Sequence, residues 1–395
     1  MARLGDVIEQ IRGVSYRPSD LSDKLDDNSV VLLRANNIQN GNLVFDDVVY
    51  VSKNRVDEKQ YLKKGDILVC TSSGSKELVG KAAIVHTDLP MVFGAFCKVV
   101  RPKVECAEYI GHFFQSPYYR NHISAASAGA NINNLRNEHI ADLQISLPPL
   151  DEQRKIVAVL DKVSDLIAKR QGQLDKLDLL VKSRFVEMFG DPVVNPHNLP
   201  TVEFGSVLTV KPQNGLYKPQ SDYNINGEGT PILRIGGFYD GKVTDFSSLK
   251  RLRCSDEELQ HYLLRENDIV INRVNSIEYL GKCGLIRGMA ESTVYESNMM
   301  RLHVDESKFN VRYVVQLLCS QFVYNQILTR AKKSVNQASI NQKDVQSLVV
   351  YMPSLDVQNK FAAFVEQVEN MKSGINVSLL KLETLKKALM QEYFS

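Results

Sequence analysis

The sequence lacks the features of an exported or membrane protein. No stretch approaches the ~18 consecutive apolar residues of a membrane-spanning helix, and residues 1–10 alternate apolar with charged side chains instead of forming a signal peptide. The six cysteines form no C-x-x-C pair, and none lies near a histidine at zinc-ligand spacing. We therefore expect a cytoplasmic protein with reduced thiols and no structural metal.

Catalytic motifs are also missing. Residues 74–82 resemble a phosphate-binding loop, but the loop is one residue too long and Ala82 stands where a hydroxyl must bind magnesium. Asn195, Pro196 and His197 resemble part of an amino-methyltransferase box without its stacking aromatic residue. The seven histidines do not lie at metal-site spacing from other ligands. We expect no catalytic residue, no metal and no cofactor in this chain.

Positive charge is only in small excess. The net charge is +2, so bulk charge does not by itself indicate a nucleic-acid partner. Basic residues gather at Lys53/Arg55, Lys63/Lys64, residues 250–253 and residues 330–333. Each group taken alone is typical of a solvated surface, so a nucleic-acid partner would have to be bound by local clusters of this kind.

The sequence does contain a repeat of half its own length. Short blocks recur in the same order roughly 200 residues apart, a period far beyond the 20–50 residues of repeat arrays. Residues 65–68 (Gly-Asp-Ile-Leu) match residues 267–270 (Asn-Asp-Ile-Val), and Leu150, Asp151 and Gln153 match Leu355, Asp356 and Gln358. Because the spacing drifts while the order is kept, the chain holds two copies of one domain with loop insertions.

Each copy has the pattern of a mixed α+β domain. Compact apolar runs at residues 30–33 and 66–69, and again at 231–235 and 268–271, predict strands that follow turn-prone residues. Periodic apolar residues predict one helix over residues 109–123 and one over residues 311–327. The fold class is therefore expected to be α+β in both copies.

A long helical pattern follows each copy. Apolar residues recur at alternating steps of three and four from Ile156 to Met188 and from Phe361 to Leu389, which is typical of a coiled-coil seam. Asp151 and Asp356 suit the N-caps of these helices, and Gly190 suits the end of the first. The expected segments are domain 1 at 1–150, helix 1 at 151–190, domain 2 at 191–355 and helix 2 at 356–395.

The two helices are expected to pack against each other. Because the second must return along the first, the pair would run antiparallel and the molecule would be pseudo-two-fold symmetric. A helix of about 35–40 residues is ~55–60 Å long, which exceeds the ~34–36 Å of one DNA turn. Two domains held by such a pair would be suited to a DNA target made of two half-sites with a spacer between them that is not recognised.

These residues carry a family resemblance. Residues 147–157 (Leu-Pro-Pro-Leu-Asp-Glu-Gln-Arg-Lys-Ile-Val) and 188–192 (Met-Phe-Gly-Asp-Pro) resemble the domain-to-helix junctions in specificity subunits of Type I restriction–modification enzymes. The resemblance extends from Leu4 to Phe394. The second junction departs from the pattern, with Ser354 in place of proline and Val357 in place of glutamate.

The resemblance implies a function and a set of partners. Each copy would be a target-recognition domain that reads one half of an asymmetric, bipartite double-stranded DNA target. The two helices would set the spacer and dock two adenine-N6 methyltransferase subunits, and motor-nuclease subunits would complete the restricting complex. S-adenosylmethionine, ATP and magnesium would belong to those partners.

Polar loops at matching places in the two copies are the candidates for DNA binding. Asn and Gln pair with adenine edges, Arg with guanine, and Lys with phosphate. For the amide residues, a structural Asx turn is an equally good interpretation. The candidates are Thr71, Ser72, Ser73, Ser75, Lys76, Asn131, Asn133, Asn134 and Arg136 in the first copy, and Arg273, Asn275, Ser276, Lys332, Lys333, Asn336, Gln337, Asn341 and Gln342 in the second.

Three other functions stay open at the level of the sequence. The chain could be the reading subunit of a related system whose methylation and cleavage are fused in one partner. It could be a free-standing coiled-coil DNA-binding regulator or scaffold. It could also be an enzyme with an unfamiliar site, which the missing motifs disfavour.

Overall fold

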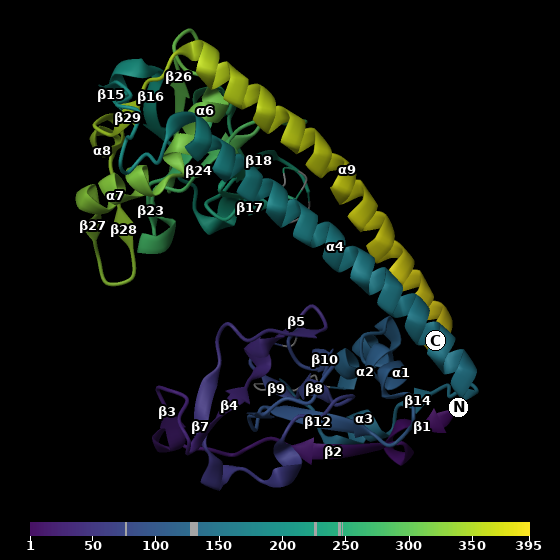
Figure 1. Ribbon diagram of the computed structural model, residues 1–395. Coiled ribbons are helices and arrows are strands. Elements are labelled where there is room, and N and C mark those ends of the chain that lie inside the picture. The colour runs from purple at the N-terminus through teal and green to yellow at the C-terminus, as the bar shows by residue number, and fades with distance from the viewer. Residues whose placement is uncertain (76, 127–132, 225–226, 244–245, 247) are drawn as a thin grey trace. The chain divides into compact units, whose positions relative to one another are not determined.

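The protein divides into two compact units that share the long helices (Figure 1). The computed structural model describes residues 1–75, 77–126, 133–224, 227–243, 246 and 248–395. One unit consists of Met1–Gly172 with Ile375–Ser395, and the other of Gln173–Gly374. We call them unit 1 and unit 2. In the described part of the chain, no helix is long and apolar enough to cross a membrane.

Unit 1 contains two four-stranded sheets and three short helices. The first sheet has the order β10-β8-β12-β2 and is antiparallel, and the second has the order β11-β4-β7-β3 with β11 parallel to β4. The strands of the first sheet are β10 (Ala82–Ile84), β8 (Ile67–Cys70), β12 (Cys97–Pro102) and β2 (Ile8–Arg12). Those of the second are β11 (Met91–Phe93), β4 (Ser29–Leu33), β7 (Val49–Ser52) and β3 (Leu21–Ser22), and the helices are α1 (Ala107–Phe113), α2 (Pro117–Ala126) and α3 (Asn137–Ala141).

Unit 2 repeats this plan with a larger first sheet. Its six-stranded sheet has the order β16-β26-β22-β24-β20-β19, and a four-stranded sheet has the order β17-β21-β18-β25. The first comprises β16 (Leu208–Asn214), β26 (Met299–Val304), β22 (Ile269–Asn272), β24 (Cys283–Leu285), β20 (Gly241–Val243) and β19 (Phe238–Tyr239). The second comprises β17 (Tyr223–Asn224), β21 (Lys250–Leu252), β18 (Thr230–Leu233) and β25 (Val294–Tyr295), and the short helices are α5 (Asp256–Tyr262), α6 (Val311–Leu318), α7 (Gln321–Arg330) and α8 (Gln342–Gln346).

The central strand of each first sheet begins at the same kind of turn. Gly65 and Asn267 both have positive φ, at 86° and 67°, a conformation that Gly and Asn adopt at the lowest cost. The four residues of β8 and of β22 that follow are all buried. The turn and the apolar run together place equivalent strands at the centre of both sheets.

One helix prediction in each copy is wrong, because the structure breaks each helix in two. Ser116 separates α1 from α2, where its hydroxyl accepts a hydrogen bond from the Tyr119 N–H at 3.2 Å. Ser320 separates α6 from α7 and caps α7 by accepting from the Val323 N–H at 3.4 Å. A serine that bonds the backbone of the following turn starts a new helix, although the apolar periodicity runs on through it.

The long helices α4 (Leu150–Phe189) and α9 (Leu355–Phe394) begin one residue before the predicted N-caps. Asp151 and Asp356 lie in the first turn, where a carboxylate interacts favourably with the helix dipole. The amide groups of Gln153 and Gln358 each donate back to the carbonyl of a preceding proline at 2.8 Å. This shared bond is the physical reason for the repeated Leu-Asp-x-Gln pattern.

In each unit the two helices run antiparallel and are bound to the domain by a common core. In unit 1, Ile156 and Leu160 of α4 cluster with Met390 and Phe394 of α9. In unit 2, Phe185 and Phe189 of α4 cluster with Phe361 of α9 and with Tyr313 of α6, with ring centroids 4.7–5.7 Å apart. The start of one helix thus packs beside the end of the other, as the sequence predicted.

Candidate nucleic-acid interface

A short polar ribbon follows the central strand of the first sheet in both units. In unit 1, β9 (Ser72–Ser73) pairs antiparallel with β13 (Asn133–Asn134). In unit 2, β23 (Val274–Asn275) pairs with β28 (Ala338–Ser339), which also pairs with β27 (Lys332–Lys333). These are the segments that hold the predicted DNA-binding residues, so the structure brings together side chains that are about 60 residues apart in sequence.

The same backbone hydrogen bonds fix both ribbons to their domains. Thr71 N–H donates to the Phe96 carbonyl at 2.9 Å, and Arg273 N–H donates to the Asn298 carbonyl at 2.9 Å. Leu135 N–H donates to the Thr71 carbonyl at 2.7 Å, and Ile340 N–H to the Arg273 carbonyl at 2.9 Å. The ribbons are therefore equivalent structures, in which Arg136 matches Asn341.

The candidates of unit 1 differ in what their side chains contact. The Thr71 hydroxyl donates to the Phe96 carbonyl at 3.0 Å and is buried, whereas Ser72 and Ser73 are half-buried and Ser75 is exposed. Asn134 and Arg136 are exposed. Lys76, Asn131 and the side chain of Asn133 lie outside the described residues.

The candidates of unit 2 fall into an anchored group and an exposed group. Arg273 donates to the Ser297 carbonyl at 3.0 Å, Asn275 accepts from the Ser276 N–H at 2.8 Å, and Asn341 caps α8 by accepting from two backbone N–H groups. For Asn341, which accepts from the N–H two residues on, the structural turn considered as an alternative is therefore present. The exposed group comprises Lys332, Lys333, Asn336, Gln337 and Gln342.

Two apolar side chains stand at these ribbons that the sequence pattern did not single out. Phe96, whose carbonyl holds Thr71, is 70% exposed, and Val335, between β27 and β28, is 96% exposed. Single apolar residues in polar loops have no periodicity, so only the fold reveals their place. Among the described residues no group of three or more His, Cys, Asp or Glu side chains could hold a metal ion.

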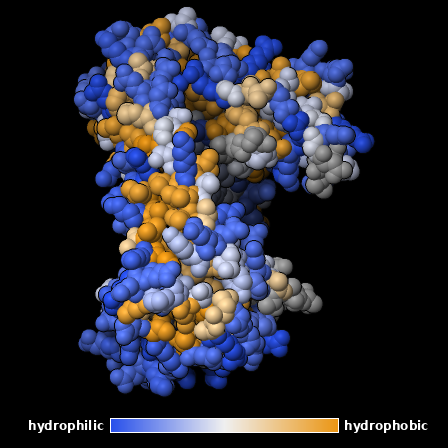
Figure 2. All heavy atoms as spheres, turned by 90° about the vertical axis from the view of Figure 1, so that its right-hand side faces the viewer, coloured by the Kyte–Doolittle hydropathy of each residue, from blue (hydrophilic) through white to orange (hydrophobic). Residues whose placement is uncertain are grey.

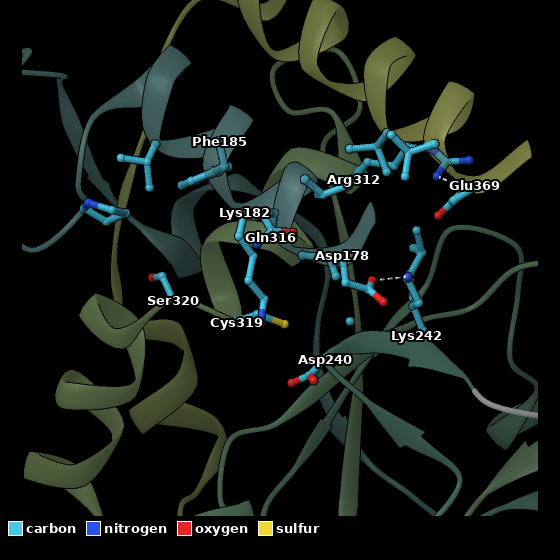
Figure 3. A pocket seen from close by; sticks show the side chains of 18 of the residues that line it. Asp178, Lys182, Phe185, Asp240, Lys242, Arg312, Gln316, Cys319, Ser320 and Glu369 are labelled. Carbon is cyan, nitrogen blue, oxygen red and sulfur yellow. Dashed lines mark hydrogen bonds and ion pairs between the residues drawn. The ribbon is translucent and has the colours of Figure 1, made fainter. Parts of the chain in front are cut away.

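Ion pairs attach the domain of unit 2 to its helices, around a cavity of about 330 Å³ (Figure 3). Asp178 of α4 accepts from Lys242 of β20 at 3.1 Å and also pairs with Lys372 of α9. Burial acts to raise the pKa of Asp178, but the hydrogen bonds from Lys372 and Lys242 outweigh it and lower that pKa. Arg312 of α6 pairs with Glu369 of α9, so the domain contacts both helices through charged groups.

Unit 1 makes the equivalent attachment with a histidine. Nε2 of His112 on α1 lies 2.8 Å from a carboxylate oxygen of Asp161 on α4, and this hydrogen bond lowers the pKa of Asp161. Lys386 of α9 lies 3.4 Å from the Gln115 side-chain oxygen, and burial lowers the pKa of its ammonium group. The two units thus use different side chains to attach the domain to the long helices.

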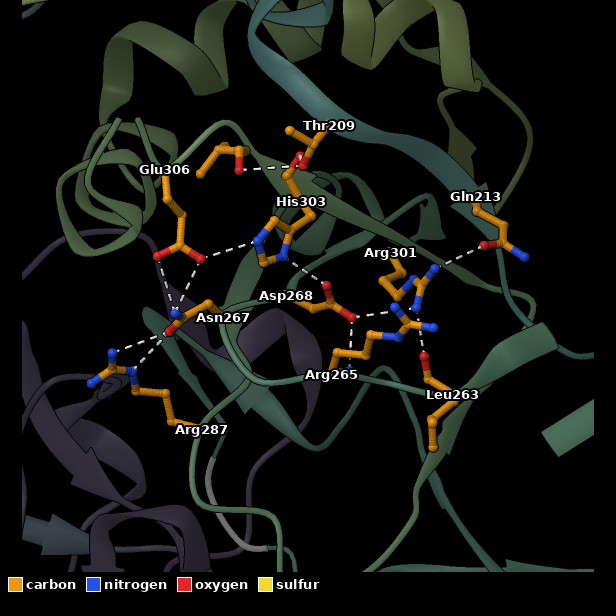
Figure 4. Close-up of polar contacts among 11 residues, drawn as sticks. Thr209, Gln213, Leu263, Arg265, Asn267, Asp268, Arg287, Arg301, His303 and Glu306 are labelled. Carbon is orange, nitrogen blue, oxygen red and sulfur yellow. Dashed lines mark hydrogen bonds and ion pairs between the residues drawn. The ribbon is translucent and has the colours of Figure 1, made fainter. Parts of the chain in front are cut away.

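A buried carboxylate also stands at the start of each central strand. In unit 1, Asp66 accepts two hydrogen bonds at 2.7 Å from Arg101. In unit 2, Asp268 lies 3.0 Å from His303 and 3.5 Å from Arg301, and His303 extends the network to Glu306 (Figure 4). Burial raises the pKa of Asp268, with the Arg265 N–H, Arg301 and His303 acting against it.

The model of the family described as "Type I restriction modification DNA specificity domain" matches residues 1–179 and 196–382. The chain belongs to this family. It is 33% identical over its whole length to the Type I restriction enzyme EcoKI specificity subunit of Escherichia coli (strain K12), of which the match covers 88%. It is 30% identical to the StySPI specificity subunit of Salmonella potsdam, again over the whole chain and 88% of the relative.

Solved structures of this family share the fold. A chain solved in work on complex assembly and conformational transition of the type I R-M system matches with a TM-score of 0.52 at 18% identity, covering 100% of this chain and 99% of that one. The Type-I restriction-modification system S subunit from M. genitalium matches with a TM-score of 0.54 at 12% identity, covering 100% and 95%. The predicted α+β class, with two tandem homologous domains joined by two long helices, is confirmed.

Proposed function

We propose that the chain is the DNA specificity subunit of a Type I restriction–modification system and that its two domains each read one half of an asymmetric, bipartite target. The observation that carries this proposal is the repetition of one polar ribbon, fixed by the same backbone bonds, in two domains of a DNA specificity family. Two copies with different ribbon residues would read two different half-sites. A free-standing regulator or scaffold, or the subunit of a system with a fused partner, has no comparable support.

The ribbons present the groups that DNA recognition needs. A two-stranded β-ribbon fits the major groove, which is about 12 Å wide. The exposed Lys332 and Lys333 suit phosphate, while the exposed amides of Asn336 and Gln337 suit adenine edges. In unit 1, Arg136 suits guanine and Asn134 suits adenine. The lysines would contribute affinity, and the amide and guanidinium groups would contribute specificity.

The helices would dock the methyltransferase partners. Exposed apolar side chains lie on these helices, namely Leu179, Leu180, Val186 and Met371 in unit 2 and Val159, Leu166, Val377, Leu380 and Leu385 in unit 1. Figure 2 shows apolar patches on the side of the molecule that it draws. An apolar surface of this kind is typical of a protein–protein interface. The parts of this helix pair in unit 1 and in unit 2 would each accept one copy of an adenine-N6 methyltransferase, and motor-nuclease subunits would join that complex.

The chemistry would belong to the partners. S-adenosylmethionine, ATP and magnesium would bind there, and this chain would supply no catalytic residue. A radiolabelled methyl-transfer assay on the isolated chain tests this part: no incorporation is expected without the methyltransferase subunit, and clear incorporation would contradict it.

Single-molecule mapping of N6-methyladenine in the host genome, with and without this gene, tests the function. We expect methylation at one split, asymmetric motif to disappear with the gene and to return with a plasmid copy. An unchanged set of methylated motifs would contradict the proposal and favour the regulator or scaffold.

A further inference from the structure

The strands β27 and β28 of unit 2 form a narrow exposed hairpin (Figure 1). Lys332 pairs with Ser339 and Lys333 with Ala338, and the turn at residues 334–337 is closed by the Ser334 N–H, which donates to the Gln337 carbonyl at 2.7 Å. β28 is held on its other side by β23. The tip therefore stands on a short ribbon whose base is hydrogen-bonded to the domain.

Val335 at this tip is the most exposed large apolar side chain among the described residues, at 96%. It is flanked by two lysines on one side and by Asn336 and Gln337 on the other. A single exposed valine needs no explanation on an ordinary surface. Here it occupies the centre of a basic, amide-rich hairpin, and its β-branched side chain is stiff, so its position is fixed by the backbone.

Phe96 is the exposed apolar side chain at the ribbon of unit 1. Its carbonyl accepts hydrogen bonds from the N–H groups of Thr71 and Ser72 at 2.9 and 3.2 Å, so it is attached directly to the ribbon strand β9. Its ring is nevertheless 70% exposed. The matching residue of unit 2 is the polar Asn298, whose carbonyl makes the same bonds to Arg273 and Val274. Each unit thus carries one exposed apolar side chain at its ribbon, supplied from a different loop.

We propose that Phe96 and Val335 are specificity-determining residues that contact the C5-methyl group of a thymine in the major groove, one in each half-site. This inference rests on the proposed function. The thymine methyl is the apolar group that the major groove presents, and Phe is among the side chains that contact it. The alternative for an apolar side chain is a wedge between base steps in the minor groove, which would not sense the thymine methyl group because that group lies in the major groove.

The test uses the complex of the full chain with its methyltransferase subunits and duplexes that carry the mapped target. Each thymine of both half-sites is replaced in turn by deoxyuridine, which keeps the base pair and removes only the methyl group. We expect a three- to fivefold loss of affinity at one thymine in each half-site, the size expected for one buried methyl group.

The two variants Phe96→Ala and Val335→Ala control for each other. Phe96→Ala should abolish the thymine–deoxyuridine difference in one half-site only, and Val335→Ala in the other only. Both side chains are exposed, so neither substitution should affect folding. Lys332→Ala with Lys333→Ala should weaken binding to every duplex and reduce its salt dependence while leaving the thymine difference intact.

The outcomes separate this inference from the function. Binding of the complex to its target no tighter than to an unrelated duplex contradicts the proposed function itself. Target-specific binding without any thymine–deoxyuridine difference, a difference that both variants retain, or a half-site that contains no thymine overturns only the role of Phe96 and Val335.

Discussion

The two units solve the same structural problems with different side chains. Unit 1 pairs its buried carboxylate Asp66 with Arg101, whereas unit 2 places Asp268 between His303 and Arg301. At the domain–helix junction the choice is reversed, with His112 and Asp161 in unit 1 and Arg312 and Glu369 in unit 2. The comparison teaches that each of these carboxylates has a hydrogen-bonding partner and that the fold leaves open which residue supplies it.

The cores at the helix junctions differ as well, and substitutions there are expected to give the largest loss of stability. Phe361 is fully buried in contact with the rings of Phe185 and Phe189, whereas its counterpart in unit 1 is Ile156, 8% exposed. Phe361→Ala should cost about 3–5 kcal/mol, because it removes a large ring from a packed cluster, and Ile156→Ala about 2–3 kcal/mol. Hydrogen exchange of the full-length variants checks this, with the loss of protection measured separately for peptides from unit 1 and for peptides from unit 2. Equal loss of protection in both units would contradict it.

The next largest loss of stability is expected on substitution of the buried carboxylate of unit 1. Asp66→Asn should cost about 2–3 kcal/mol, less than the 3–5 kcal/mol of a fully buried pair because Arg101 is 20% exposed. Denaturant unfolding checks the value. Asp66→Asn with Arg101→Met, which removes both partners, should recover part of the loss, and no recovery would show that the ion pair is not its cause.

Asp268 in unit 2 predicts a smaller cost with a defined pH dependence. Asp268→Asn should lower the free energy of unfolding by about 1 kcal/mol at neutral pH. The loss is small because the Arg265 N–H, which donates to the Asp268 carboxylate at 2.8 Å, still has the amide oxygen of asparagine as an acceptor. Burial raises the pKa of Asp268. Its contribution to stability is therefore complete below the ordinary aspartate value of about 3.9 and is lost as the pH rises through the raised pKa. The difference between wild type and variant should grow on acidification from pH 7, and a difference that shrinks would refute this account.

The smallest loss of stability is expected at the His112–Asp161 contact of unit 1, and its pH dependence has the opposite sign. The hydrogen bond from His112 lowers the pKa of Asp161, so its contribution is present above about pH 3.9 and is lost as the pH falls through the lowered pKa. Because the Asp161 side chain is 53% exposed, Asp161→Asn should cost no more than about 1 kcal/mol at neutral pH. Thermal unfolding of both proteins at pH 7 and pH 3 checks that the difference is smaller at the lower pH; a constant difference would exclude the ion pair.

The sequence predicted those parts of the fold that local patterns encode. Its internal repeat predicted two equivalent domains, its apolar seams predicted the two long helices, and its polar loops lie on the two ribbons. The helices begin at Leu150 and Leu355, one residue before the predicted N-caps. Local hydrogen bonds at Ser116 and Ser320 broke the predicted short helices, because periodicity does not report on a capping hydroxyl.

The partners of buried charges could not be predicted in the same way. Asp66 and Arg101, like Asp268 and His303, lie 35 residues apart, and only the pairing of β8 with β12 and of β22 with β26 brings them together. Phe96 and Val335 were missed for the same reason, since their place at a ribbon depends on the bonds of Phe96 to the Thr71 segment and on the pairing of β28 with β23.

The central claim is that each domain reads its own half of a split target, and duplicating one domain tests it most directly. Residues 191–355 would be replaced by a second copy of residues 1–150, with both helices kept and co-purification with the methyltransferase subunit as the control for folding. Because α4 and α9 pair in antiparallel fashion in both units, mapping of N6-methyladenine should reveal a new palindromic target built from one wild-type half-site and its inverted repeat. Methylation that stays at the original asymmetric motif, or moves to a direct repeat, would contradict the account.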